Sequence, residues 1–417
     1  MAKVLKYTLD FGTSNTLLGA VTELGKVSSI PLDFKNVDNT HVLKSLIYTP
    51  NEHEWYYGVE CYDKYLEFEG EGRFFRSFKT LLSRESFEGT MIHGKRVDVV
   101  ELVARFLREV RHRANSFYQQ DVTSIVCGRP VRFGDTDKSD TLALSRLTKA
   151  LKLAGFSDIE FTYEPVAAAK SMNIKLGGES KVLIADLGAG TSDFSVINMK
   201  NGKFSPSDIL SVSGVNVAGD SFDYSLMKNF ILPDFGSQVK YKRPGSSIEH
   251  GISKKLVSQL CSPAIFSLVN DLSISNYIEE AIDLIEDSED MRKIENLESL
   301  FDSKLGFDLM KEVELAKIDL SKFMERELSY SKSGVKFKAR IERGKYNESS
   351  KCVEDKVLEA LEMALLKAEL KDMEIDTVIC TGGSIHNPLF LNKLEMIFGK
   401  DKLVLSDSQE SVVSGLN

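Results

Sequence analysis

Two segments of the sequence end an apolar run in an aspartate and continue into a turn of glycine and hydroxyl residues. The first is Leu-Asp-Phe-Gly-Thr-Ser-Asn at residues 9–15, and the second is Ala-Asp-Leu-Gly-Ala-Gly-Thr at residues 185–191. Backbone N–H groups and hydroxyls in such turns can bind phosphate oxygens, and an aspartate at a strand end suits a hydrated Mg2+, which takes few protein ligands. The pair therefore predicts that two hairpins hold a nucleoside triphosphate between two lobes.

The repetition of this pattern is more informative than either copy. The two aspartates, Asp10 and Asp186, lie 186 − 10 = 176 residues apart, and each turn is followed by apolar alternation typical of a returning strand. A single turn of this kind occurs in many hairpins that bind nothing, and a lone strand-end aspartate is usually a turn cap. The sequence contains neither G-x-x-x-x-G-K-[ST] nor a G-x-G-x-x-G that opens a helix, so the other common phosphate loops are not indicated.

Composition and charge argue against several other classes. The chain has 417 residues, of which 42% are hydrophobic and 28% charged, which is ordinary for a soluble globular protein of two or more domains. Its formal net charge of −9 argues against nucleic acid or an anionic membrane as a partner, and we interpret the basic residues between 105 and 113 as a solvated helix face. Five scattered cysteines, no secretory signal pattern and no apolar run of about 20 residues favour a reducing, cytoplasmic location.

Strand and helix patterns alternate along most of the chain and indicate an α/β fold with sheets buried on both faces. We predict helices over residues 97–119, 141–154 and 352–370, and strands over 124–128 and 377–380. Two insertions interrupt the alternation, an aromatic-rich one and a charged one that we predict to be helical. The predicted organisation is lobe I, 1–176 (subdomain IA, 1–36 and 98–176; inserted subdomain IB, 37–97), and lobe II, 177–417 (subdomain IIA, 177–219 and 345–417; inserted subdomain IIB, 220–344).

Five segments together resemble the nucleotide-binding domain of the heat shock protein 70 chaperones, within the actin-like ATPase superfamily. They are, in the family's order, residues 9–15, 163–169 (Tyr-Glu-Pro-Val-Ala-Ala-Ala), 186–193, 218–223 (Ala-Gly-Asp-Ser-Phe-Asp) and 381–388 (Thr-Gly-Gly-Ser to Pro). The resemblance spans essentially the whole chain and is greatest to the short YegD-like members, which consist of the ATPase part without a peptide-binding domain. It implies an actin-like ATPase fold of two duplicated ribonuclease-H-like lobes, each with an inserted subdomain, and the nucleotide in the central cleft.

The phosphate and metal residues follow from the two turns and from the resemblance. We expect the phosphates to be bound by Gly12, Thr13, Ser14, Gly188, Ala189, Gly190 and Thr191. Asp10 and Asp186 would hold Mg2+ through its waters, with Asp193 nearby as a third residue of the metal site. Ala189 replaces the glycine that is usual in the family, and we expect its methyl group to crowd the β- or γ-phosphate, so that binding is more firmly predicted than turnover.

The resemblance also implies a catalytic set, which is Lys79, Glu164, Asp186 and Thr191. Lys79 matches the family lysine that reaches into the cleft and steadies the γ-phosphate and the attacking water; the alternative is a surface lysine. Glu164 follows an apolar strand and precedes Pro165, which is typical of the first turn of a helix. By resemblance Glu164 orders the water, and helix capping is the alternative.

By resemblance, the nucleoside would lie against two further groups of residues. The first group is Gly219, Gly382, Gly383, Ser384 and His386, and the second is one face of a helix, Glu314, Lys317, Ile318 and Ser321. The glycines let the backbone pass close beneath ribose and adenine, and His386 stands where many relatives place an adenine-stacking arginine. Asp407 or Gln409 would make a second contact between the lobes.

We therefore expect an ATP-binding, slowly ATP-hydrolysing, chaperone-like protein of the heat shock protein 70 type without the peptide-binding domain. Its cofactors would be ATP/ADP and Mg2+, and its partners a co-chaperone, an exchange factor or client proteins, but no nucleic acid and no membrane. Three alternatives stay open: a nucleotide sensor with little hydrolysis, an actin-like filament protein, and a small-molecule kinase of the same superfamily. Bacterial actin homologues share the phosphate-turn motifs, whereas the Gly-Gly-Ser segment at 382–384 and Asp193 favour the chaperone type.

Overall fold

A computed structural model of the chain describes residues 2–25, 27–37, 39–134, 136–171, 178–200, 205–262, 264, 271–405 and 411–416. The chain groups into two compact units. Unit 1 comprises Met1–Lys64, Phe75–Gly219 and Val353–Asn417, and unit 2 comprises Tyr65–Phe74 and Asp220–Cys352. Both sheets that we assigned to separate lobes lie in unit 1, so the division into two lobes stays a prediction.

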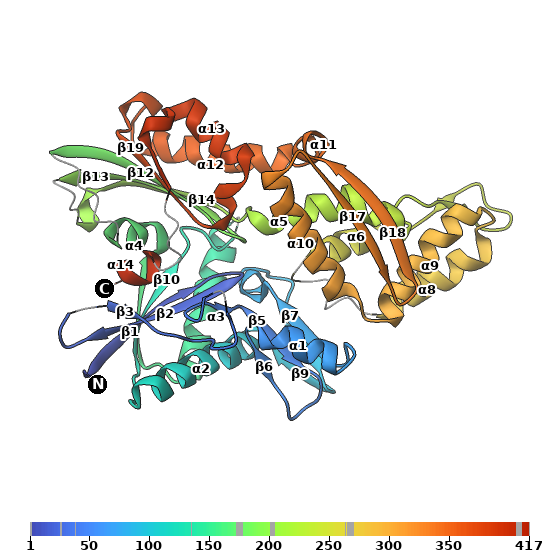
Figure 1. Cartoon of the computed structure of the whole chain (residues 1–417), viewed down its shortest axis with the longest axis horizontal. Helices are drawn as coiled ribbons and strands as arrows, with labels where there is room; N and C mark the ends of the chain where they lie inside the picture. The colour runs from blue at the N-terminus through green and yellow to red at the C-terminus, as the bar shows by residue number, and fades with distance from the viewer. Residues whose placement is uncertain are drawn as a thin grey trace. The chain divides into compact units, whose positions relative to one another are not determined.

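Unit 1 contains two sheets with the same topology (Figure 1). The first runs β11(Asp158–Tyr163), β10(Ser124–Arg129), β1(Val4–Phe11), β2(Asn15–Thr22), β3(Val27–Ser29), with β4(Leu43–Lys44) paired to β2. The second runs β20(Leu403–Leu405), β19(Thr377–Thr381), β12(Glu179–Leu187), β13(Ser192–Lys200), β14(Ile209–Val215). In each sheet, three antiparallel strands are followed by two strands parallel to the first. The sequence repeat is thus a repeat of sheet topology.

The two hairpins also share their register. Asp10 is the next-to-last residue of β1 and pairs with Leu17, and Asp186 is the next-to-last residue of β12 and pairs with Asp193. Because side chains alternate along a strand, equal register sends the two aspartates to equivalent faces of their sheets. Each turn therefore begins at the same point relative to its aspartate.

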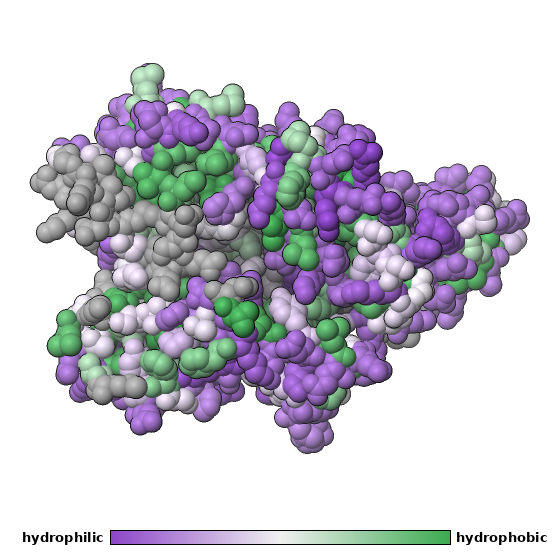
Figure 2. Space-filling view, in the orientation of Figure 1, coloured by the Kyte–Doolittle hydropathy of each residue, from purple (hydrophilic) through white to green (hydrophobic). Residues whose placement is uncertain are grey.

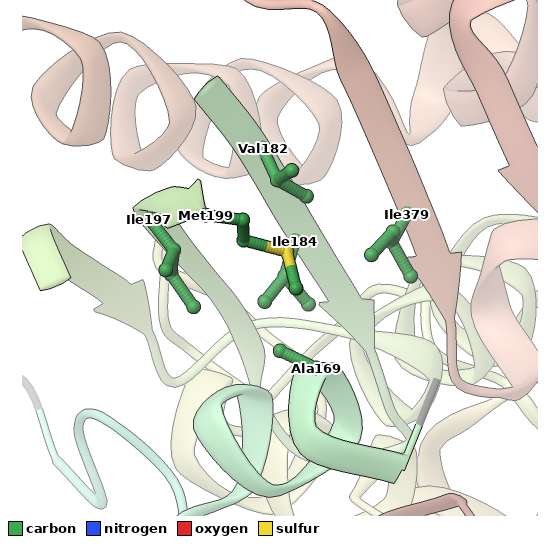
Figure 3. Packing of buried hydrophobic residues seen from close by; sticks show 6 residues of the cluster. All are labelled: Ala169, Val182, Ile184, Ile197, Met199 and Ile379. Carbon is green, nitrogen blue, oxygen red and sulfur yellow. The ribbon is translucent and has the colours of Figure 1, made fainter. Parts of the chain in front are cut away.

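Helix α4(Glu164–Ser171) lies between the two sheets and belongs to the core of both. Figure 3 shows Ala169 of α4 against one face of the second sheet. The sheet side chains around it are Val182, Ile184, Ile197, Met199 and Ile379. On its other side, Ala167 and Ala168 pack with Val126 of β10 and with α14(Ser411–Gly415). This small-residue helix fixes Glu164, its first residue, beside the ends of both sheets.

Capped helices cover the outer faces of the sheets. α2(Val99–Tyr118) begins where Asp98 accepts the Glu101 N–H, and its Phe106 packs on Phe11 of β1. α3(Asp137–Leu153) begins four residues before our prediction, because Thr136 and Ser139 form a capping box in a polar stretch without helical periodicity. On the second sheet, Ser211 of β14 donates to the Ala364 carbonyl of α12(Lys351–Lys367), and α13(Pro388–Phe398) follows β19.

The segment between β4 and α2 consists of short elements. They are β5(Leu46–Thr49), β6(Tyr56–Tyr57), α1(Glu60–Glu67), β7(Arg73–Arg76), the 3-10 helix η1(Phe78–Leu81), β8(Gly89–Ile92) and β9(Lys95–Asp98). Ser77 precedes η1 in the left-handed backbone region, with φ 51°, which is uncommon for a residue other than glycine. This bend turns η1, and with it Lys79, into the interior of unit 1.

Unit 2 is a mixture of helices and hairpins. Its elements are α5(Gly219–Leu226), β15(Tyr241–Lys242), β16(Glu249–His250), α6(Lys254–Cys261), α8(Asp271–Leu284), α9(Ser288–Asp302), α10(Gly306–Lys322), β17(Glu325–Lys332), β18(Val335–Glu342) and α11(Arg343–Ser349). The segment 65–74 belongs here through Phe74, whose ring stacks on Phe307 at 3.8 Å. Within the described residues, no helix combines the length and apolar character that a membrane span requires.

The prediction of a wholly helical insertion was wrong for residues 325–342, which form the β17–β18 hairpin. Buried and exposed residues alternate strictly along β18, with Phe337 and Ile341 inside and Lys338 and Arg340 outside. The surface over the elements of unit 2 is mainly hydrophilic in Figure 2. The turn at Ser333 and Gly334 has two positive φ angles, 42° and 89°, the form that matches the twist of a hairpin. The period of two and the glycine turn were present in the sequence but were overlooked among helix-forming charged residues.

Candidate functional site

The two glycine turns lie against each other in unit 1. A β-carbon added to Gly190 would stand 2.5 Å from the Thr13 hydroxyl oxygen and 3.3 Å from a methyl of Thr80. Only a residue without a side chain fits at this approach. The structure thus brings both predicted phosphate turns, 12–14 and 188–191, into one place beside η1.

The first turn is held from outside by Ser45, which lies between β4 and β5. The Ser45 hydroxyl donates to the Gly12 carbonyl at 2.8 Å, and its N–H donates to the Ser14 carbonyl at 2.9 Å. Its oxygen is also within 2.9 Å of the Thr16 hydroxyl. Gly12 itself has no space for a side chain, because a β-carbon would lie 2.3 Å from the Asn15 carbonyl oxygen.

The second turn is held by Gly219 and Ser384. The Gly188 carbonyl accepts from the Ser384 hydroxyl at 2.6 Å and from the Gly219 N–H at 3.3 Å, and the Gly188 N–H donates to the Thr191 carbonyl at 2.9 Å. Gly382 has φ 86°, and a β-carbon there would come within 2.3 Å of the Leu187 carbonyl oxygen and 2.8 Å of an Asp186 oxygen. The 382–384 segment therefore rests on the end of β12, next to Asp186.

Lys79 and Glu164 form a buried ion pair beside the turns. Their charged atoms are 3.1 Å apart, and their side chains are 7% and 10% exposed, so Lys79 is not a surface lysine. The Lys79 ammonium also lies 5.8 Å from the ring centre of Phe11 and 5.7 Å from that of Phe133, within the range of cation–π attraction. Sequence spacing did not single out either ring.

Burial and mutual repulsion raise the pKa values of the aspartates in this cluster. Burial, followed by the Glu164 carboxylate and then by Asp193, raises the pKa of Asp186 to about 8. Burial and Glu164 raise the pKa of Asp193 to about 7, against the hydrogen bonds from Thr191 and Val131 that lower it. The pKa of Asp10 is raised well above its ordinary value, first by burial and then by Glu164. Burial lowers the pKa of Lys79, but Glu164 and Asp10 outweigh it, so the lysine stays protonated.

The charge balance of the cluster fits a bound cation. Four carboxylates, of Asp10, Glu164, Asp186 and Asp193, surround one ammonium group, and oxygen ligands of this kind suit Mg2+. Within the described residues, no group of three or more histidine, cysteine, aspartate or glutamate side chains is arranged as a direct metal cage. A cation held through waters by Asp10 and Asp186 remains the arrangement that we predict.

Asp193 differs from the two strand-end aspartates because its side chain is already engaged. It is 1% exposed, and its Oδ1 accepts the Val131 N–H at 2.7 Å. A β-carbon on Gly214 of the neighbouring strand would lie 2.5 Å from the same oxygen. Asp193 thus links the segment after β10 in the first sheet to β13 in the second.

The remaining predicted residues lie in three places. Gly383 and His386 are exposed in the 3-10 helix η6(Gly383–His386), and a β-carbon on Gly383 would meet nothing within 4 Å. The second group, Glu314, Lys317, Ile318 and Ser321, lies on α10 in unit 2. There Lys317 pairs with the buried Asp223 at 2.8 Å. The proposed lobe contacts at residues 407 and 409 fall outside the described residues.

Sequence reasoning missed the residues that hold the site together. Ser45 stands in an unremarkable Leu-Lys-Ser-Leu-Ile stretch, and Val131 acts through its backbone N–H, so neither gave a signal.

The basic residues of α2 were interpreted too simply as a solvated face. Arg111 donates to the Val122 carbonyl, Arg113 to the Leu32 carbonyl, and Arg105 lies 4.4 Å from the ring centre of Trp55. These arginines fasten α2 to its neighbours.

Comparison with known proteins adds a family relationship to this geometry. A family model described as Hsp70 protein matches residues 81–247 and 282–416. The chain is 22% identical over 419 residues to the chaperone protein DnaK of Thermosipho melanesiensis, covering 98% of this chain and 57% of that protein. It is 26% identical to the chloroplastic heat shock 70 kDa protein 7 of Arabidopsis thaliana and 25% identical to the stromal 70 kDa heat shock-related protein of Pisum sativum, in each case covering 77% of this chain. The chain thus matches 57% of the first relative's length and 37% of each of the other two.

Proposed function

Because the chain belongs to the Hsp70 protein family, we propose that unit 1 binds ATP with Mg2+ and hydrolyses it slowly to ADP and phosphate. The observation that carries the proposal is the meeting of the two glycine turns beside the Lys79–Glu164 pair. Thr13, Ser14, Ala189 and Gly190 would supply N–H groups to the phosphates. Backbone donors that are already held in place lose little freedom when the anion binds.

Asp10 and Asp186 would hold the cation, which would supply positive charge to the phosphate oxygens. Their raised pKa values support this assignment, since a cation removes the repulsion that opposes their ionisation. Thr191, which donates a hydrogen bond to Asp193, completes the second turn. Asp193 stays in the proposed metal site only as a neighbour.

Phosphoryl transfer to water depends on placement and charge stabilisation more than on covalent help. Lys79 would steady the γ-phosphate, and Glu164 would orient the attacking water. Their ion pair supports these roles, because each group holds the other in a single position before substrate arrives. Within unit 1, the nucleoside would lie against residues 382–384 and His386.

At the level of the whole protein, we propose a chaperone-like switch whose nucleotide state changes a surface for a co-chaperone, an exchange factor or client proteins. The relatives are named as chaperone and heat shock proteins, and they are longer than the matched region. A nucleotide sensor with little hydrolysis is the second candidate. Ala189 is the observation that favours it, because a methyl group in a phosphate turn can hinder a transition state.

The decisive experiment measures ATP binding by calorimetry and single-turnover hydrolysis with Mg2+. We expect wild type to bind and to hydrolyse slowly. Lys79→Ala should still bind ATP but lose turnover by about 10²- to 10³-fold, and Asp186→Ala should lose the Mg2+-dependent part of the affinity. Lys95→Ala, an exposed lysine of β9, is the matched control and should behave as wild type. Wild type that binds but never hydrolyses would support the sensor, and wild type that does not bind ATP would refute the site.

A further inference from the structure

The two glycine turns share a device that lies outside both sequence motifs. In each turn, the carbonyl of the glycine two residues after the aspartate accepts a hydrogen bond from a serine hydroxyl. Ser45 donates to Gly12 at 2.8 Å, and Ser384 donates to Gly188 at 2.6 Å. The two serines come from unrelated places in the chain, one between β4 and β5 and the other in η6. Equivalent carbonyls are therefore held by two independent serines.

Holding a carbonyl also aims the next N–H group. The C=O of one residue and the N–H of the following residue belong to the same planar trans peptide unit and point in opposite directions. When Ser45 fixes the Gly12 carbonyl, it fixes the Thr13 N–H on the far side of that plane. Ser384 does the same for the Ala189 N–H. Within the described residues, neither of these N–H groups is donated to a protein acceptor.

We propose that Ser45 and Ser384 are positioning residues that aim the Thr13 and Ala189 N–H groups at the phosphates of the bound nucleotide, an inference that rests on the proposed ATP site. Neither serine needs to touch the phosphates for this role. A turn whose peptide planes are free to rotate must be ordered when the anion binds, and that ordering weakens binding. The serines remove this cost before the nucleotide arrives.

Ser45 carries the clearer case. It is 1% exposed and holds the first turn at two carbonyls, through its hydroxyl to Gly12 and through its N–H to Ser14. Ser45→Ala removes the hydroxyl bonds and leaves the backbone bond in place. The variant therefore loosens one peptide plane without removing a group from the proposed phosphate contact.

The test compares the affinities of wild type and Ser45→Ala for ATP, ADP and adenosine by calorimetry with Mg2+. We expect Ser45→Ala to bind ATP and ADP about three- to tenfold more weakly, the effect of one hydrogen bond, and adenosine within about twofold of wild type. Ser195→Ala is the matched control, since Ser195 is a fully buried serine of β13 whose hydroxyl has no partner within the described residues. It should bind all three as wild type does.

Ser384→Ala tests the second half of the proposal. It should likewise weaken ATP binding more than adenosine binding. The double variant should lose more ATP affinity than either single variant, and because the two turns touch, the departure from the product of the single effects measures their coupling. Equal losses for ATP and adenosine in Ser384→Ala would instead indicate a direct nucleoside contact and overturn its positioning role. ATP affinity that is unchanged in Ser45→Ala would overturn the role of Ser45.

The failure of this inference can be told apart from failure of the proposed function. If wild type binds neither ATP nor adenosine, the nucleotide site itself is wrong, and the positioning role falls with it. If wild type binds ATP and both serine variants bind it equally well, only the inference is refuted. If Ser45→Ala does not fold, Ser45→Cys keeps a similar shape with a weaker donor, and it should still show a larger loss for ATP than for adenosine. If Ser45→Cys binds ATP as tightly as wild type does, the role of Ser45 is refuted.

Discussion

The β1–β2 and β12–β13 hairpins have the same register but different chemistry opposite their aspartates. Asp10 pairs with Leu17, which is 2% exposed and packs with Val42 and Val413. Asp186 pairs with Asp193, which is equally buried but holds the Val131 N–H. The first hairpin therefore contributes an apolar core residue at the position where the second contributes a charged link between the sheets.

The difference shows that the two hairpins share their backbone structure, whereas the side chains proposed to act on the nucleotide come unequally from the two halves of the chain. Lys79 and Glu164 both come from the chain between the two hairpins, before β12. The support of the second turn by Gly219 and Ser384 comes from the chain after β13. The two turns therefore have the same backbone register. The first half of the chain provides the Lys79–Glu164 ion pair, and the second half provides Asp193, which accepts the Val131 N–H.

The largest effect is expected from the ion pair, which has no counterpart in the second half. Glu164→Gln should lower single-turnover hydrolysis by about 10²- to 10³-fold, because the neutral amide forms no ion pair with the Lys79 ammonium and holds the attacking water less firmly. ATP affinity should change little. Glu160→Gln, an exposed glutamate of the preceding strand β11, is the control and should turn over as wild type. Turnover preserved in Glu164→Gln would remove the catalytic asymmetry between the halves.

Asp193 in the second hairpin has two candidate roles, as a structural link between the sheets and as a metal residue. The two roles predict different results for Asp193→Ala and Asp193→Asn. As a link, Asp193→Ala should lower the free energy of unfolding by about 1–3 kcal/mol, since it leaves the Val131 N–H without its acceptor. Asp193→Asn keeps an oxygen acceptor and should stay near wild type in denaturant unfolding and in the Mg2+ dependence of ATP binding. If Asp193→Asn instead loses the Mg2+ dependence of ATP binding, as we expect of Asp186→Ala, then Asp193 acts at the metal. The second hairpin would then contribute two metal residues and the first hairpin one.

The raised pKa values make stability depend on pH. Asp186 and Asp193 have pKa values of about 8 and about 7 in the folded chain, so between about pH 4 and 8 the folded state binds more protons than the unfolded state. The free energy of unfolding should therefore fall as pH rises through this window. In the absence of divalent cations, the melting temperature should drop by several degrees between about pH 6 and 8, and Mg2+ with ATP should restore more of it at the higher pH.

Asp186→Asn checks the origin of this dependence, since it removes the group whose pKa is about 8. Its melting temperature should fall less than that of wild type across the same window. A slope unchanged from wild type would show that the strand-end aspartate of the second hairpin does not produce the pH effect.

The repeat was predictable from sequence because it is local. Asp10 and Asp186 close apolar strands, and glycine turns follow them within a few residues, so the pattern could be identified without tertiary information. The Hsp70 family relationship rested on such segments and is confirmed by the family model. Helix α2 was predicted to within two residues at its start and one at its end, since its apolar stripe has the helical period.

The contacts that complete the site were not predictable, since they join distant segments through ordinary residues. Ser45 reaches Gly12 across 33 positions of sequence, and Val131 reaches Asp193 across 62. A serine hydroxyl or a backbone N–H carries no signature of its own until the fold brings a partner to it. The prediction for residues 325–342 failed for another reason: charged residues on the exposed faces of β17 and β18 suggested a helix.

The smallest effect is expected at Ala189, where the two turns can be compared position by position. Ala189 lies three residues after Asp186, and Thr13 lies three residues after Asp10, so the first turn already carries a β-carbon at the equivalent place. The position without space is the next one, since a β-carbon on Gly190 would stand 2.5 Å from the Thr13 hydroxyl.

We therefore expect Ala189→Gly to change ATP affinity and turnover by no more than about twofold, and Gly190→Ala to weaken ATP binding by roughly tenfold, because it pushes the two turns apart. Calorimetry measures the ATP affinity of the two variants and of wild type, and single-turnover hydrolysis measures their turnover. A rise of tenfold or more in the turnover of Ala189→Gly would reverse this view. It would mean that the methyl group restrains the reaction in the wild-type chain, and that the protein is closer to a nucleotide sensor than to an ATPase.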